Sequence, residues 1–301
     1  MMMKMNVVTK SIRRRERVHD ILKRALSSSP SASSLTLYQY AICPFCHKAK
    51  ALLSYASIPH QIVEVNPLTK AELKSLDDQT HKKVPVAVIE DQQKQINGSN
   101  EILQHLLNDP KVQQSLSDKW NGDQEMTLET FRQGEHVERW WYRYADDELA
   151  SLLYPNVCRT LTDSRAAFSY VKNVHNFSPL QKIMIHNLGA LAMYFAASKI
   201  KSKHNIKNEQ KALQTALDIF EKEALEEGQY LFSSQRTVPD MGDLTVYGVL
   251  RSVKGLPAHD FALKESRESN ILLDWYMRME KEVEGDPDGD HHRNDDTGGD
   301  K

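Results

Sequence analysis

Two cysteines separated by two residues, Cys43 and Cys46, lie where the sequence changes from a strand pattern to a helix pattern. Residues 35–40 have the composition of a short buried strand, and apolar side chains recur at helical spacing over residues 45–56. Pro44 suits the first position of that helix, where a missing amide costs nothing. A Cys-x-x-Cys pair in this setting is typical of a thioredoxin- or glutaredoxin-like α/β domain.

The alternation of strand and helix patterns continues to residue 108. We expect further strands at 60–65, 86–89 and 94–96, the last two as a hairpin, with a short helix at 70–76 and a final helix from Ser99. This order is that of a mixed-sheet α/β unit. We therefore assign residues 35–108 to a glutaredoxin-like, thioredoxin-fold domain.

The rest of the chain divides by composition. Residues 109–125 are polar and poorly periodic, which predicts a linker, whereas residues 126–283 show only helical patterns, which predict an all-α domain. Asp240 and Asp243 predict a capping box at the start of one helix of that domain. Residues 284–301 are acidic, rich in Gly and free of aromatic residues, which predicts a disordered tail.

The first 34 residues are distinguished by their basic charge. This segment contains eight Lys and Arg residues but only two acidic residues, Glu16 and Asp20. Apolar residues recur in it at helical spacing, and a Ser-rich stretch follows at residues 27–34. A basic amphipathic helix followed by serines resembles an organellar transit peptide, so we favour the mitochondrion. The alternative is a basic N-terminal arm on a cytoplasmic protein.

Composition excludes several classes of protein. A chain of 301 residues with 40% hydrophobic residues can bury the cores of two domains, and a formal charge of −2 is unlike that of a nucleic-acid-binding protein. The three cysteines do not form a secreted disulfide framework, which favours a reducing compartment. The longest notable apolar run, residues 189–197, is shorter than the ~18 residues that span a bilayer, so we expect no transmembrane segment.

The position of Cys43 predicts an ionised thiol. The free amides of the first helical turn and the helix dipole favour the thiolate, and such sites lower a cysteine pKa of about 8.5 by one to several units. Cys46 lies one turn further along on the same face, where it can resolve a mixed disulfide. A structural zinc half-site or two inert thiols are the alternatives, but the sequence has no second Cys pair to complete a zinc site.

Two further positions predict a site for an extended peptide such as glutathione. A proline at the position of Pro85 is usually cis in this fold, which would turn the backbone of Val84 toward Cys43. The alternative is a trans proline that opens an edge strand. Ser99 and the free amides behind it could hold a carboxylate, although a plain N-cap explains the same residue.

The neighbours of the motif have weaker assignments. Tyr40 and Phe45 flank Cys43 and are candidates for the wall of a hydrophobic pocket, although core packing explains Tyr40 equally well. We expect His47 to be a solvated helix residue and not a base. We expect Cys158 to be an ordinary thiol of the helical domain.

Six short segments, spread over residues 35–280, match one known family. They are Leu37-Tyr38-Gln39-Tyr40 with Cys43-Pro44-Phe45-Cys46, Val65-Asn66-Pro67, Lys83-Val84-Pro85, Trp141 with Ala145-Asp146-Asp147, Pro155-Asn156-Val157 with Arg159-Thr160, and Asp243-Leu244 with Val246-Tyr247-Gly248-Val249-Leu250-Arg251. In this order they closely resemble the prostaglandin E synthase type 2 family.

The resemblance implies both an architecture and a reaction. The family has a glutaredoxin-like domain followed by a glutathione-transferase-like helical domain, commonly forms a homodimer, and isomerises the lipid endoperoxide prostaglandin H2 to prostaglandin E2. Its members bind glutathione and can also hold haem, with the glutathione sulfur reaching the iron.

The resemblance also implies roles for single residues. Cys43 would be the catalytic thiol, with Tyr40 and Phe45 shaping its pocket, and Val84 and Ser99 would bind glutathione.

This chain departs from the family at two points. Gly98 stands where the family has an acid, which removes a partner for the glutathione amine, and the apolar membrane anchor of animal members is absent.

Two other functions are consistent with the same residues. One is a glutathione-dependent thiol–disulfide oxidoreductase or glutathione transferase that uses both Cys43 and Cys46. The other is a haem- or glutathione-binding module without turnover. The isomerase needs Cys43 alone, so the requirement for Cys46 separates it from the oxidoreductase.

Overall fold

The computed structural model describes residues 35–121, 123, 126–132, 139–225, 230, 237–265 and 269–285, without the side chains of residues 139, 141 and 142. The predicted N-terminal arm, most of the predicted acidic tail and the side chain of Trp141 therefore lie outside the described residues.

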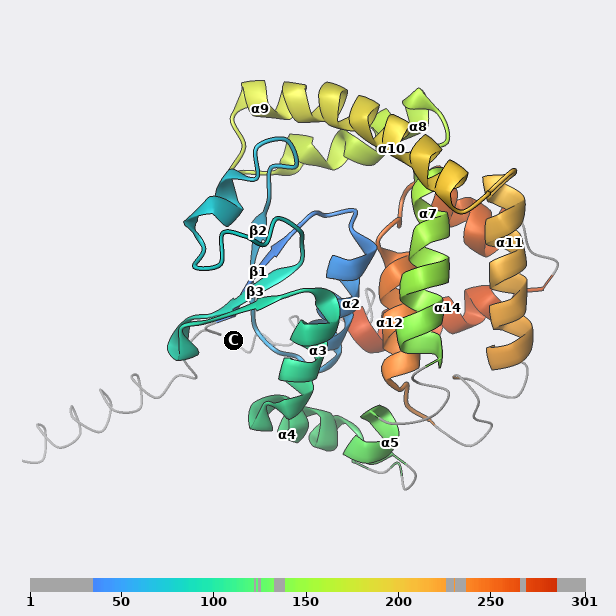
Figure 1. Cartoon of the computed structure of the whole chain (residues 1–301). Helices are drawn as coiled ribbons and strands as arrows, with labels where there is room; N and C mark the ends of the chain where they lie inside the picture. The colour runs from blue at the N-terminus through green and yellow to red at the C-terminus, as the bar shows by residue number, and fades with distance from the viewer. Residues whose placement is uncertain are drawn as a thin grey trace, which may run out of the picture. The chain divides into compact units, whose positions relative to one another are not determined.

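A four-stranded mixed sheet forms the first part of the described chain (Figure 1). Its strands are β1 (Leu35–Gln39), β2 (Gln61–Glu64), β3 (Val86–Ile89) and β4 (Lys94–Asn97), in the order β2-β1-β3-β4. The central strand β1 pairs parallel with β2 and antiparallel with β3, and a short turn, η2 (Glu90–Gln92), joins β3 to β4. The four predicted strands are present, and their ends differ from the prediction by at most one residue.

The helices of this part cover the sheet and position the cysteine pair. Helix α2 (Pro44–Tyr55) begins directly after Cys43, with Pro44 at its first position as predicted, and α3 (Ser99–Asn108) begins at Ser99. The short helix predicted at 70–76 is a tighter turn, η1 (Ala71–Ser75), which follows Lys70 in a left-handed conformation with φ 51°.

The segment predicted to be a linker contains a helix, α4 (Pro110–Lys119). The side chain of Asp109 accepts a hydrogen bond from the N–H of Lys111, and Pro110 occupies the first helical position. Beyond the helix, Trp120 donates a 3.1 Å hydrogen bond through Nε1 to the hydroxyl of Tyr55. The helix has few apolar residues because only one side of it packs on the core, which explains the weak periodicity of the sequence.

The second part is helical, as predicted. Its elements are α5 (Leu128–Arg132), η3 (Arg139–Leu149), α7 (Ala150–Val157), α8 (Leu161–Ala167), η4 (Phe168–Asn173), α9 (Pro179–Met184), η5 (Ile185–Gly189), α10 (Ala190–Lys203), α11 (Glu209–Phe220), η6 (Glu221–Leu225), α12 (Met241–Arg251), α13 (Pro257–Asp260), η7 (Phe261–Glu265) and α14 (Ile271–Glu284). The capping box predicted at Asp240 and Asp243 is confirmed at the start of α12, and Asp243 also accepts a 2.8 Å hydrogen bond from Trp275 Nε1.

The two parts pack closely against each other through α2 and α12. A side-chain carbon placed on Gly248 would lie only 2.7 Å from the carbonyl oxygen of His47, so the two helices approach at a distance that only glycine permits. Buried apolar side chains of both parts, such as Leu52 and Leu250, belong to one continuous core. The helix that carries the cysteine pair is therefore held by the helical part as well as by its own sheet.

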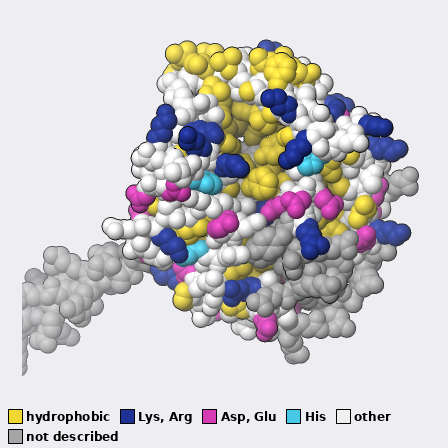
Figure 2. Space-filling model, viewed as in Figure 1, with side chains coloured by type: hydrophobic (Ala, Val, Ile, Leu, Met, Phe, Trp, Pro, Cys, Tyr) yellow, Lys and Arg dark blue, Asp and Glu magenta, His cyan; other side chains and the backbone are white. Residues whose placement is uncertain are grey.

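The continuous helical run formed by α9, η5 and α10 has an exposed apolar face. Leu180 and Ile183 are 67% and 62% exposed, and Phe195 is 56% exposed. Figure 2 shows this apolar surface at the top of the view. By length and composition alone, the run from Pro179 to Lys203 could cross a membrane. Of its most apolar 18-residue stretch, 22% is buried in this structure. This qualifies the expectation of no transmembrane segment, which rested on shorter uninterrupted apolar runs.

Candidate active site

Cys43 occupies the N-cap of α2, at the carboxyl end of the loop that leaves β1. Its backbone N–H donates a 3.0 Å hydrogen bond to the carbonyl of Tyr40, and its own carbonyl accepts one of 3.1 Å from His47. The residue is only 5% exposed, and its extended N-cap conformation places it beside the free amides of the first helical turn. This is the position that the sequence pattern predicts.

Four neighbouring groups lower the pKa of Cys43. The thiol of Cys46 contributes most to lowering the pKa of Cys43, burial opposes it, and the backbone N–H groups of Cys46 and Phe45 and the hydroxyl of Tyr154 lower it further. Burial, together with the neighbouring Cys43, raises the pKa of Cys46 well above its usual value. The negative charge therefore resides on Cys43, while Cys46 keeps its proton and donates it in a hydrogen bond.

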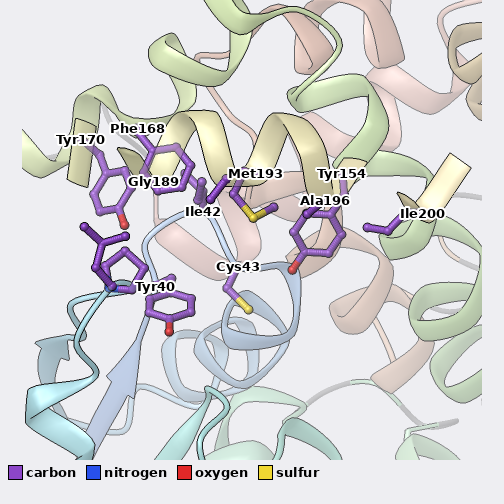
Figure 3. A pocket seen from close by; sticks show the side chains of 13 residues that line it. Tyr40, Ile42, Cys43, Tyr154, Phe168, Tyr170, Gly189, Met193, Ala196 and Ile200 are labelled. Atoms are coloured by element: carbon purple, nitrogen blue, oxygen red, sulfur yellow. The ribbon is translucent and has the colours of Figure 1, made fainter. Parts of the chain in front are cut away.

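Cys43 opens into an apolar cavity of about 380 Å³ whose walls come from both parts of the chain (Figure 3). The residues that line it are Tyr40, Ile42, Cys43, Pro67, Leu68, Tyr154, Phe168, Tyr170, Gly189, Ala192, Met193, Ala196 and Ile200. Most are hydrocarbon or aromatic side chains, and the polar atoms are tyrosine hydroxyls and the reactive sulfur. The cavity can therefore hold a largely apolar molecule against a nucleophile.

Glu64, at the end of β2, fixes the loop that precedes Cys43. Its Oε1 accepts a 2.8 Å hydrogen bond from the N–H of Ala41, and its Oε2 accepts one of 3.1 Å from Gln39 Nε2. The hydroxyl of Tyr170 helps to lower the pKa of the same carboxylate. Burial raises the pKa of Glu64, and these hydrogen bonds oppose the shift. One carboxylate thus orients the loop on one side and a cavity tyrosine on the other.

The predicted pocket residues separate into two groups. Tyr40 lines the cavity, and burial and the nearby Cys43 raise its pKa to about 12, so its hydroxyl stays protonated. Phe45 does not belong to the lining residues; it packs partly buried against the core and contributes its backbone N–H to the sulfur.

The predicted glutathione residues lie around the same loop but outside the cavity lining. The Val84–Pro85 peptide bond is cis, as predicted, and Val84 packs half-buried against the same apolar cluster as Tyr40. The carbonyl of Pro85 accepts a 3.0 Å hydrogen bond from the N–H of Gly98, which brings this loop next to the start of α3. Ser99 is buried there.

The N-cap interpretation of Ser99 is wrong by one residue. Gly98 is the N-cap of α3, with φ +98°, and Ser99 is the first helical residue. The carboxylate of Glu101 bends back over Gly98, since a side-chain carbon on Gly98 would lie 2.5 Å from Glu101 Oε2. An acid is therefore present at this turn, although it comes from the third helical position and not from residue 98.

His47 is buried, contrary to the expectation of a solvated residue. It is 7% exposed, and its Nε2 lies 2.8 Å from the carbonyl oxygen of Ala41. Burial, with a contribution from Lys50, lowers the pKa of His47 to about 3, so the ring is neutral at physiological pH and Nε2 is the donor. No local pattern predicts this burial, because it arises from α12, which packs on α2 from another part of the chain.

Sequence reasoning also missed the cavity residues of the helical part, above all Tyr154, Phe168 and Tyr170. They lie over a hundred positions from Cys43 along the chain, and no local motif connects them to it. Cys158, in contrast, is buried at the C-terminal end of α7, and burial raises its pKa, as expected of an ordinary thiol.

Comparisons with known proteins agree on the type of protein. Residues 37–112 match the family model for the glutathione S-transferase N-terminal domain. The mouse protein named prostaglandin E synthase 2 is 30% identical over 318 residues, covering 93% of this chain and 79% of the mouse protein. The zebrafish protein of that name (Danio rerio) is also 30% identical, covering 82% of this chain and 70% of its own length.

Solved structures with a similar chain path include glutathione complexes. Glutaredoxin 2 from Salmonella typhimurium with glutathione is 17% identical, with a TM-score of 0.48, covering 83% of this chain and 94% of that one. Ure2p in complex with glutathione is 12% identical, with a TM-score of 0.48, covering 83% of this chain and 96% of that one.

Proposed function

Since this chain belongs to the prostaglandin E synthase 2 family, we propose that it is an isomerase that converts prostaglandin H2 to prostaglandin E2 at the sulfur of Cys43. One observation carries the proposal: a cysteine thiol whose pKa is lowered by its neighbours opens into an apolar cavity of about 380 Å³. The cavity and the thiol each meet one requirement of the reaction.

The cavity suits a lipid endoperoxide. Ile42, Leu68, Phe168 and Met193 give it hydrocarbon walls, against which the alkyl chains of such a substrate would lose contact with water. The polar endoperoxide would then lie at the end that holds Cys43 and the tyrosine hydroxyls.

The thiolate of Cys43 supplies the nucleophile. It attacks the peroxide oxygen attached to C9, a sulfur–oxygen bond forms, and the oxygen–oxygen bond breaks with its electron pair moving to the second oxygen. Loss of the C9 proton then forms the ketone as the sulfur–oxygen bond breaks and the thiolate returns. The sequence of steps consumes no oxidant or reductant, as an isomerisation requires.

Glutathione is the proposed small-molecule partner. The backbone beside the cis Val84–Pro85 bond is available to pair with an extended peptide, and the first turn of α3 with Ser99 offers amides to a carboxylate. Haem stays a prediction of the family resemblance alone. The described lining residues include no Lys or Arg to pair with its two propionates, and we route no step through it.

A thiol–disulfide oxidoreductase is the second candidate, and the contact between the two cysteines favours it. The thiol of Cys46 is hydrogen-bonded to the sulfur of Cys43, so it is placed to attack a mixed disulfide formed there. The homodimer stays a prediction of the family resemblance. The mitochondrial destination stays a prediction of residues 1–34, which lie outside the described part.

The test offers purified full-length protein, with and without glutathione, prostaglandin H2 and a model disulfide in parallel reactions. We expect prostaglandin E2 well above the amount formed without protein, and loss of that excess in Cys43→Ser. Cys158→Ser is the matched control, because Cys158 is the third buried cysteine and does not line the cavity. Disulfide reduction without prostaglandin E2 would instead establish the oxidoreductase.

A further inference from the structure

Three tyrosines line the cavity, and two of them interact with an acidic group beside it. Tyr170 and the carboxylate of Glu64 raise and lower each other's pKa, whereas Tyr154 helps to lower the pKa of the Cys43 thiol. Figure 3 shows the Tyr154 hydroxyl directed toward Cys43 from the helix on the opposite wall. Tyr154 is therefore the cavity residue whose acidic proton lies against the reacting atom.

We propose that Tyr154 is a catalytic acid and base of the isomerisation, which gives its proton to the departing peroxide oxygen and takes the proton from C9. This assignment rests on the proposed function and names the residue that moves its protons. Cys43, from the sheet part, would then be the nucleophile, and Tyr154, from the helical part, would transfer the protons.

The backbone around Tyr154 is anchored, so its side chain is presented from a fixed position. The carbonyl of Tyr154 accepts a 3.0 Å hydrogen bond from the N–H of Cys158. Asn156, two residues on, donates through Nδ2 to the carbonyls of Leu152 at 2.8 Å and Glu209 at 2.9 Å, which joins α7 to the start of α11. A proton donor needs such fixed placement to act at a defined atom.

The surroundings keep the Tyr154 proton in place before the reaction. Burial, and then the negative charge of Cys43, raise the pKa of Tyr154 well above its usual value. The hydroxyl is therefore fully protonated at neutral pH and carries a proton that it can give. Once it has lost its proton, the same raised pKa makes the phenolate a strong base.

The bond changes balance with Tyr154 in both roles. The Cys43 thiolate attacks the oxygen on C9, and the oxygen–oxygen bond pair goes to the second oxygen, which takes the Tyr154 proton and becomes the hydroxyl group. The phenolate then removes the C9 proton, the C–H pair forms the ketone, and the sulfur–oxygen pair returns to Cys43. As the oxygen–oxygen bond breaks, the negative charge moves from the sulfur to the second oxygen, and Tyr154 gives its proton to that oxygen.

Two other titratable groups near Cys43 are engaged elsewhere. Glu64 accepts hydrogen bonds from Ala41 and Gln39, which leaves its carboxylate a positioning group. His47 directly follows Cys46 in the sequence, but it does not line the cavity, and its Nε2 donates to the carbonyl of Ala41.

The decisive variant is Tyr154→Phe, which keeps the ring and removes the proton. We expect kcat to fall about 100-fold or more with little change in KM, as for loss of a general acid–base group. Tyr276→Phe is the control, because that buried hydroxyl has no hydrogen-bond partner among the described residues. Alkylation of Cys43 by iodoacetamide across pH measures the thiolate fraction of each variant, so that rates can be compared per thiolate.

A second variant separates proton transfer from packing. In Tyr154→Ala, added 4-methylphenol should restore part of kcat by filling the space with a hydroxyl-bearing ring, whereas toluene, which lacks the hydroxyl, should not. Turnover per thiolate in Tyr154→Phe equal to wild type, or equal rescue by toluene, would overturn the assignment and leave the isomerase intact. A wild-type protein that forms no prostaglandin E2 would overturn the isomerase and this role together.

Discussion

Lys48 and Asp146 form an ion pair where α2 packs against the helical part. Lys48 is fully buried and also donates a 2.9 Å hydrogen bond from Nζ to Asn100 Oδ1, and Asn100 donates through Nδ2 to the second oxygen of Asp146 at 3.1 Å. The three residues come from α2, α3 and η3, so one polar triangle joins the helix behind the reactive thiol to both parts of the chain.

The two ends of this ion pair should contribute unequally to stability. Asp146→Ala leaves a buried ammonium with one amide oxygen as its partner, and we expect the free energy of unfolding to fall by about 3–5 kcal/mol. Lys48→Met fills the same space without charge and leaves Asp146, which is 15% exposed, bonded to Asn100, so its cost should be smaller. Urea unfolding at pH 7 measures both, and an equal or larger loss for Lys48→Met would contradict the prediction.

Replacements of Cys46 should separate its two roles. Cys46→Ser keeps a hydroxyl donor to the Cys43 sulfur, so isomerisation should survive while reduction of a model disulfide is lost. Cys46→Ala removes the donor that contributes most to lowering the pKa of Cys43. Its isomerase rate at pH 7 should fall and recover as the pH rises, because a higher pKa of Cys43 leaves a smaller fraction of thiolate. A pH profile identical to that of Cys46→Ser would show that the donor has no such effect.

His47 should make the protein sensitive to mild acid. Its pKa in the folded chain is about 3, below the usual value, so between these two pH values the unfolded chain binds a proton that the folded chain does not. Stability from this residue is therefore present above about pH 6.5 and is lost by about 1.4 kcal/mol for each pH unit below it. His47→Gln keeps a donor for Ala41 without titrating. From pH 7 to pH 5, the free energy of unfolding of the wild type should therefore fall by about 2 kcal/mol more than that of the variant. A constant gap in urea unfolding would count against it.

Glu101 should contribute to glutathione affinity in place of the acid that the family has at position 98. Its carboxylate lies over Gly98, and Glu101→Gln removes the charge while preserving the shape. We expect about a tenfold higher Kd for glutathione by calorimetry, as for loss of one charge-assisted hydrogen bond. Glu129→Gln, on the exposed surface of α5, is the control. Equal affinity for Glu101→Gln and wild type would exclude Glu101 from the amine site.

The sequence predicted those features that depend on neighbours along the chain. The strands, the position of Cys43 before α2, the cis bond at Pro85 and the capping box at Asp240 follow from local patterns and short motifs. Helix α4 was not predicted, because few of its residues are apolar and its periodicity is therefore weak. The capping residue Asp109 was a local signal of this helix.

The features that the sequence did not predict depend on contacts between distant segments. His47 is buried by α12, and Tyr154 reaches Cys43 from α7. Neither contact leaves a trace in the spacing of residues around the Cys-Pro-Phe-Cys motif. A pattern of residue types can identify a nucleophile, but the groups that surround it are decided by how α7 and α12 pack.

The contact between Tyr154 and Cys43 has a consequence for how such proteins diversify. The acidity of the thiol is set partly by a side chain encoded more than a hundred codons downstream, in a region free to change without altering the motif. Grafting the sheet part onto another helical partner would transplant the cysteines but not their chemistry. Proteins that share the Cys-Pro-Phe-Cys motif could therefore evolve different reactivities through a single substitution on α7.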